Sequence, residues 1–296
     1  MTESIEDYGD TKKCLLGALY SDMGRYDEAE EFLQAALKGR REVWDETHQE
    51  TLWVMAELGR LYHSQGRYKE AEELLCSTLE TARQVLGEAH LLSMYAMHIL
   101  GTLYLSQNRY DKADLLLAEA FEIARRSLGE DNWFTLRIMN TLAQLYTVQG
   151  RYAEAEKLYL KTLGAQRRVL CDDHPYTVST VNGLALLRTQ QGHLEDTNDL
   201  FQEALRGKQR RLGADHPDTL ETKNDLAVLY KEQGDYEKAE PLLIEAVEGR
   251  RLKLGEIHPH TLQSLNTLVD LYEAWNKPEK VNQWRTKLEQ MEDFEE

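Results

Sequence analysis

Apolar residues along the chain form two short helical stripes separated by a break. In the segment 135–146 they are three or one residues apart, the spacing of one face of an amphipathic helix. These positions are Leu136, Met139, Leu142, Ala143 and Tyr146. A second stripe of the same kind runs from about Ala153 to about Leu170. Gly150 lies between them, where a helix that ends needs a left-handed residue. The pattern predicts two helices joined by a tight turn.

This two-helix pattern recurs every 42 residues along nearly the whole sequence. The residues at the turn are Gly24, Gly66, Asn108, Gly150, Gly192, Gly234 and Asn276. A strict period between 20 and 50 residues is typical of stacked units that contact only their neighbours. The repeats lie near 9–50, 51–92, 93–134, 135–176, 177–218, 219–260 and 261–296. We therefore expect one all-α domain over 1–296, a right-handed superhelical solenoid of about seven helix-turn-helix repeats and about 14 helices.

Several residue types recur at fixed positions of the repeat, where packing or capping explains them. One tyrosine of each typical repeat is expected to fill the gaps between repeats. These tyrosines are Tyr20, Tyr62, Tyr104, Tyr146, Tyr230 and Tyr272. A histidine precedes the first helix of five repeats, at His48, His90, His174, His216 and His258. Groups so spaced cannot converge on one metal or substrate, so we interpret these histidines as loop and cap residues.

The order of these positions resembles the tetratricopeptide repeat. The second repeat carries the pattern as Leu58-Gly59, Tyr62, Ala71, Leu75 and Thr78. The ordinary unit has 34 residues, and the 42-residue form resembles the repeats of kinesin light chains and of related arrays in fungal and bacterial signalling proteins. The resemblance implies a helical array with a concave groove lined by the first helix of each repeat. It does not identify a ligand, because one fold serves many functions.

Composition restricts the partners and the location. The formal net charge is −17 and the pI is about 5.0, which disfavours nucleic acid and anionic membranes because both attract basic surfaces. The sequence contains no apolar run long enough for a transmembrane helix, and Met1–Tyr8 lacks a signal-peptide core. The three cysteines, Cys14, Cys76 and Cys171, are scattered, as in a reducing compartment. We expect a cytoplasmic protein.

Motifs that carry catalysis or hold cofactors do not occur in this sequence. It has no phosphate-binding loop, no Gly-x-Ser-x-Gly nucleophile motif, no His-Glu-x-x-His and no paired Cys-x-x-Cys. The sequence analysis therefore predicts no catalytic residues, no metal site, no cofactor and no enzymatic activity.

The candidate site is a row of asparagines, one in the first helix of each of the last four repeats: Asn140, Asn182, Asn224 and Asn266. In kinesin light chains, asparagines at the matching position clamp cargo peptides, and the resemblance implies that role here. An amide can hold a peptide backbone because it offers both donors and an acceptor. The alternative is that each asparagine bonds to the neighbouring repeat. Further groove residues expected from the same helix face are Arg60, Arg137, Gln144 and Lys231.

Two functions follow from this groove. The first is a protein-interaction scaffold or adaptor that binds an extended peptide or a partner helix. The alternative is a sensor or regulatory ligand-binding domain of a larger signalling protein, linked to an ATPase or a kinase. Self-association through the terminal repeats also stays open. Kinesin light chains bind Trp-acidic peptides through basic groove residues, and because this chain has few of those, that preference is not carried over.

Overall fold

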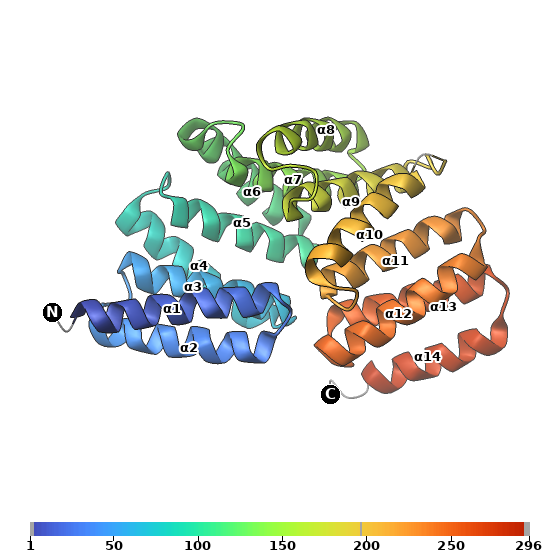
Figure 1. Cartoon of the computed structure of the whole chain (residues 1–296), viewed down its shortest axis with the longest axis horizontal. Helices are drawn as coiled ribbons and strands as arrows, with labels where there is room; N and C mark the ends of the chain where they lie inside the picture. The colour runs from blue at the N-terminus through green and yellow to red at the C-terminus, as the bar shows by residue number, and fades with distance from the viewer. Residues whose placement is uncertain (1–2, 196, 293–296) are drawn as a thin grey trace. The chain divides into compact units, whose positions relative to one another are not determined.

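The computed structural model describes residues 3–195 and 197–292, which form fourteen α-helices and no strand (Figure 1). The chain divides into two compact units, residues 1–151 and 152–296. The helices of the first unit are α1 (Glu3–Asp22), α2 (Tyr26–Val43), α3 (Gln49–Ser64), α4 (Tyr68–Leu86), α5 (Leu91–Ser106), α6 (Tyr110–Leu128) and α7 (Trp133–Val148). Those of the second unit are α8 (Tyr152–Val169), α9 (Pro175–Gln190), α10 (Thr197–Leu212), α11 (Pro217–Glu232), α12 (Tyr236–Leu254), α13 (Pro259–Ala274) and α14 (Pro278–Glu292). The expected all-α helical array is confirmed. That residues 1–296 form a single domain stays a prediction.

The turn inside each repeat adopts the left-handed backbone predicted for it. Gly24, Gly66, Gly150, Gly192 and Gly234 have φ between 69° and 78°. Asn108 and Asn276 occupy the same position with φ of 58° and 55°. Asparagine is one of the few side chains that tolerate this region.

The loop histidines cap the first helices, as expected. Each of the five accepts a hydrogen bond through its side chain from the backbone N–H two residues later. In the fourth repeat Asn132 replaces histidine and accepts from the N–H of Phe134 at 2.9 Å. Pro175, Pro217 and Pro259 begin their helices, where the missing N–H is no loss.

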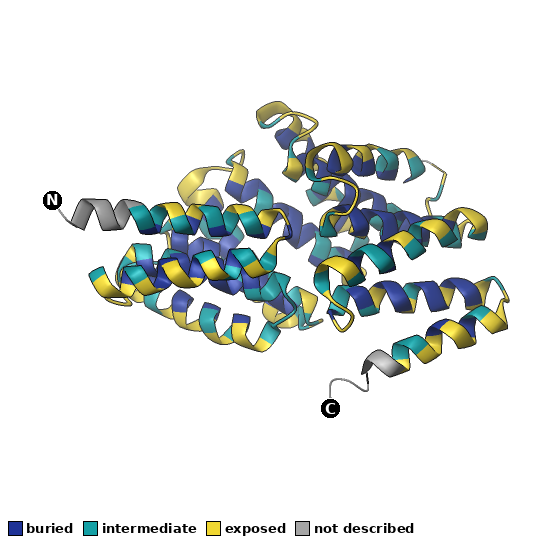
Figure 2. Ribbon diagram, turned by 60° about the horizontal axis from the view of Figure 1, so that its bottom comes forward, coloured by how far each residue is buried: buried dark blue, intermediate teal, exposed yellow. Residues whose placement is uncertain are grey.

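Close packing within a repeat depends on small residues. A Cβ added to Gly59 would lie 2.6 Å from Cγ of Leu75, so glycine lets the leucine of α4 approach the backbone of α3. The alanines of the second helices, Ala29, Ala71, Ala113, Ala155 and Ala239, are fully buried. Figure 2 shows these buried faces turned toward neighbouring helices, with exposed residues on the outer side.

Three of the recurrent tyrosines, Tyr104, Tyr230 and Tyr272, donate a hydrogen bond to the repeat before their own. The hydroxyl of Tyr104 donates to Glu72 of the preceding repeat at 3.0 Å, and Arg109 donates to the same carboxylate at 2.8 Å. The guanidinium of Arg109 also lies over the Tyr104 ring, 4.2 Å from its centroid. Burial and these contacts make the tyrosines structural, as predicted.

First helices form the inner layer of each unit. In the first unit α3 contacts both α1 and α5, and α5 contacts α7. In the second unit α11 contacts both α9 and α13. Among the described residues, no second helix contacts the second helix of a neighbouring repeat. Each unit therefore curves with its first helices inside, and their uncovered side is called the inner face below.

Candidate functional site

The inner face is the candidate site, and the predicted residues belong to its helices in two groups. Arg60 on α3 and Arg137, Asn140 and Gln144 on α7 belong to the first unit. The second unit holds Asn182 on α9, Asn224 and Lys231 on α11, and Asn266 on α13. The three helices of the second group are packed in succession, so they present one continuous strip.

The asparagines are more buried than we expect of side chains that line an open groove. Asn140, Asn182 and Asn224 are 9%, 7% and 4% exposed. Their side-chain oxygens are inaccessible and have no hydrogen-bond partner among the described residues. A ligand can therefore bind these three asparagines only through their amide nitrogens. Asn266 differs, because it is exposed and donates to the backbone oxygen of Leu262 at 3.1 Å.

Asn182 links two repeats within the second unit. Its amide nitrogen donates to a carboxylate oxygen of Asp225 on α11 at 2.9 Å. In the first unit, Nε2 of His98 on α5 lies 3.0 Å from the hydroxyl of Thr141 on α7. Both pairs are 43 residues apart. The alternative role for the asparagines was a bond to the neighbouring repeat. The amide nitrogen of Asn182 makes such a bond.

Asp225 is the most perturbed carboxyl of the second unit's inner face. Burial raises its pKa to about 6, and the like charge of Glu221, one turn earlier on α11, adds to the effect. The hydrogen bond from Asn182 acts in the opposite direction but does not outweigh them. Asp225 forms no ion pair among the described residues.

Acidic groups on the inner face of the first unit are matched by arginine. Arg60 lies 2.9 Å from the carboxylate of Glu57 and 2.8 Å from that of Asp22. The hydroxyl of Tyr95 also donates to Glu57, at 2.6 Å, and burial raises the pKa of this tyrosine. Both carboxylates of this network thus share one guanidinium, that of Arg60.

Aromatic side chains add a stack to the same face. The Trp53 and Tyr95 rings lie 5.2 Å apart and nearly parallel. The guanidinium of Arg137 lies 5.7 Å from the Tyr95 centroid. Trp53, Tyr95 and Arg137 follow one another at the same position of three successive repeats, so the stack runs along the first unit.

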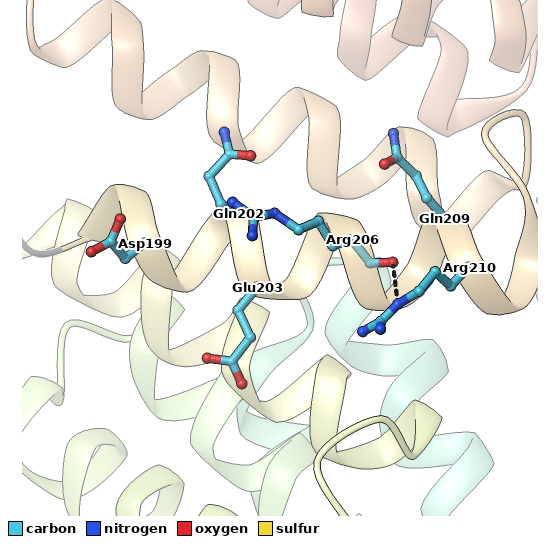
Figure 3. A pocket seen from close by; sticks show the side chains of 6 residues that line it. All are labelled: Asp199, Gln202, Glu203, Arg206, Gln209 and Arg210. Atoms are coloured by element: carbon cyan, nitrogen blue, oxygen red, sulfur yellow. Dashed lines mark hydrogen bonds between the residues drawn. The ribbon is translucent and has the colours of Figure 1, made fainter.

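Two hollows are found among the described residues of the second unit, and no asparagine of the row is among the residues that line them. The larger, of about 650 Å³, follows α10 in the outer layer (Figure 3). Its described lining carries both signs of charge: Asp199, Gln202, Glu203, Arg206, Gln209 and Arg210. Arg210 is already paired with Asp173 at 2.6 Å and Glu203 with Arg167 at 2.9 Å. The smaller, of about 130 Å³, lies between α9, α10 and α11 beside the buried Lys208. Neither hollow groups residues that suggest chemistry.

Within the described parts of the chain, no three His, Cys, Asp or Glu side chains are grouped so that they could hold a metal ion. None of the described helices has both the length and the apolar character that a membrane crossing requires.

Asp225 is the residue that the sequence analysis missed. It directly follows Asn224 and stands four residues after Glu221, so the two carboxyls share one face of a helix. That spacing was a readable signal of an acidic pair. Its bond to Asn182 was not readable, because it joins two repeats.

Family models now identify the repeat. Models of the tetratricopeptide repeat match residues 11–84, 134–210, 182–252 and 226–284, and a second tetratricopeptide model matches 93–133. The chain belongs to the tetratricopeptide repeat family. No curated protein matches the chain in sequence.

Several solved structures have a similar fold. A putative kinesin light chain from Podosopora anserina with nearly identical repeats is 24% identical, with a TM-score of 0.51 over 69% of this chain and 97% of that chain. NprR in complex with its cognate peptide NprX is 17% identical, with a TM-score of 0.70 over 95% of this chain and 77% of that chain. The Rap conjugation gene regulator of plasmid pLS20, in complex with the Phr* peptide, is 15% identical, with a TM-score of 0.72 over 96% and 74%. At these identities the similarity concerns the fold.

Proposed function

We propose that the protein is a non-enzymatic interaction module that binds an extended peptide segment along its inner face. The observation that carries this proposal is the uncovered polar strip of α9, α11 and α13, in which asparagine recurs in successive repeats. Solenoid repeat proteins use such extended surfaces for binding. The amide nitrogens of Asn182 and Asn224 would donate to peptide carbonyls, since their oxygens are buried.

Peptide complexes of similar folds support the same proposal. NprR and the Rap regulator are both found with a bound peptide. Because this similarity extends over 95–96% of the chain, it also favours the second candidate, a peptide-sensing regulatory domain. The two candidates share the binding event and differ in what the event controls.

The first test is a selection of peptide ligands followed by substitution of the asparagines. Displayed random peptides are selected on the immobilised protein, and the selected peptides are titrated against Asn182→Ala/Asn224→Ala. We expect an affinity loss of about tenfold or more, because two backbone hydrogen bonds are removed. The melting temperature should fall modestly, because the variant also loses the bond from Asn182 to Asp225, so the titrations are run well below it.

The matched control is Asn282→Ala, which removes an exposed asparagine from α14, outside the inner face. It should bind like the wild type. Equal affinities for all three proteins would refute binding along the inner face.

A further inference from the structure

The inner face of the second unit carries an excess of acidic side chains. The charged residues of α11 and α13 on this face are Glu221, Asp225, Lys231, Glu232, Asp270 and Glu273. Lys231 is the single basic residue in that set, and it lies 3.5 Å from Glu232. Two further charges are compensated from other helices, since Glu221 lies 3.5 Å from Lys208 and Glu273 pairs with Arg285.

Asp225 and Asp270 remain without an ion-pair partner among the described residues. They occupy successive first helices that contact each other. The cations nearest Asp225 already have other partners. Lys208 donates to the backbone oxygen of Asp218 at 3.0 Å, and Arg250 donates to Ser264 at 2.7 Å. His260 supplies no charge at neutral pH, because burial and Arg250 lower its pKa.

Two buried amide side chains lie beside Asp225. The Asn182 side chain is more than nine-tenths buried, contacts Asp225 through its nitrogen and has an unpartnered oxygen. Asn224, adjacent to Asp225, is likewise buried with an unpartnered oxygen. Because both oxygens are inaccessible, the partly exposed carboxylate of Asp225 is the acceptor left for a ligand. Asp225 therefore belongs to the set of acidic residues on this face and also lies beside both amides.

We infer that the second unit's inner face binds a basic peptide segment, with lysine or arginine side chains against Asp225 and Asp270. This inference rests on the proposed function and specifies its ligand. Side chains of an extended peptide point alternately to opposite sides, so every second residue faces the strip. A cationic head near Asp225 relieves the repulsion between this carboxylate and Glu221, which the positive charges of Lys208 and Arg250 offset only in part.

The inner face of the first unit does not offer a basic peptide the same unpaired carboxylates as that of the second unit. Its acids, Glu57 and Asp22, both bind Arg60. A basic ligand gains no unpaired carboxylate there. The preference for basic peptides is thus expected for the α9, α11 and α13 strip alone.

The test uses three fluorescent peptides of about 12 residues that place lysine, glutamine or glutamate at alternate positions. The full chain is titrated with each. We expect the lysine peptide to bind at least about tenfold more tightly than the glutamine peptide. Raising the salt concentration should weaken lysine-peptide binding, because partly exposed charges are screened.

Specific substitutions separate the site from the overall negative charge. Asp225→Asn/Asp270→Asn should lower the affinity for the lysine peptide about tenfold. The control Glu237→Gln/Glu279→Gln removes the same charge from exposed positions on α12 and α14, and should change the affinity less than about twofold. Equal losses in both variants, or no loss in either, would overturn the inference.

The outcome for the proposed function is read separately. If the three peptides bind equally and Asn182→Ala/Asn224→Ala weakens all of them, the groove function stands and the basic preference fails. If substitution of the asparagines leaves every peptide unaffected, binding along the inner face fails as well.

Discussion

Asp225 combines a structural role with an electrostatic penalty. Its carboxylate accepts the hydrogen bond from Asn182 that joins α9 to α11. The same carboxylate is partly buried beside Glu221, and its pKa is about 6 instead of 3.8. A group whose pKa is raised by folding stabilises the folded state below its unfolded pKa. That contribution is lost as the pH rises through the folded pKa.

Replacement of this carboxyl should therefore stabilise the protein at neutral pH. Asparagine keeps an acceptor for Asn182 and removes the charge, so Asp225→Asn should raise the melting temperature at pH 7 by about 2–4 °C. Near pH 4 the two proteins should melt together, because Asp225 is then protonated when folded. Thermal unfolding followed by circular dichroism at both pH values measures this.

Asp270→Asn is the control for this stability measurement, since Asp270 is exposed and forms no ion pair among the described residues. It should leave the melting temperature unchanged at either pH. A wild-type protein more stable than Asp225→Asn at pH 7 would mean that the carboxylate is satisfied in the fold.

The candidate site residues and their surroundings were only partly predictable from the sequence. The asparagine row was readable because one residue type recurs every 42 positions. The burial of Asn182 was not, because it depends on the side chain of Asp225 in the next repeat, 43 residues away. Asparagine also differs along the row. Asn266 bonds its own helix, whereas Asn224 does not.

The first helix of each of five repeats begins after a capping histidine that can be recognised in the sequence. Nδ1 of His174 accepts from the N–H of Tyr176 at 3.2 Å. Burial and Arg211 lower the pKa of His174, so the ring stays neutral and keeps its acceptor. Asn132 performs the same task in the preceding repeat. Either side chain supplies the acceptor that the first turn requires.

Substitution of one cap tests this equivalence. His174→Ala should lower the free energy of unfolding by about 1 kcal/mol, whereas His174→Asn should be nearly neutral. Urea denaturation of the three proteins measures the difference. Equal losses for alanine and asparagine would show that ring packing, rather than capping, is what His174 contributes.

Helix existence and turn position were the most predictable features, because each depends on a local signal. Apolar spacing, Gly150 and Pro175 marked one helix pair within a few residues of α7, α8 and the start of α9. Which face of a helix stays uncovered was known only through the family resemblance. In the structure that face follows from contacts between first helices and from their absence between second helices.

Self-association through the terminal repeats remains a prediction for the whole molecule, and the two ends differ in what they expose. Leu19 on α1 is 54% exposed, flanked by the exposed Leu15 and Met23. The same position of the later repeats holds fully buried leucines: Leu61, Leu103, Leu145, Leu187, Leu229 and Leu271. The exposed residues of α14 are mainly charged and polar. An apolar stripe of this kind favours association at the first repeat.

If the chain self-associates, Leu19→Glu should shift it toward the monomer. Light scattering over a concentration series measures the molar mass of the wild type and of this variant. The control Leu252→Glu changes another exposed leucine, on α12, and should leave the molar mass as in the wild type. A wild type that is monomeric at every concentration would end the self-association hypothesis.

The contacts between first helices also have a mechanical meaning. In a bent beam, the layer whose length stays constant is the one whose parts are fastened directly to each other. Within the second unit α9, α11 and α13 are fastened in this way, whereas α10 and α12 are joined only through the first helices between them. Flexing of that unit therefore changes the spacing of the outer helices first. We expect the distance between Asn182 and Asn224 to change least, which would give a ligand along the inner face a constant spacing.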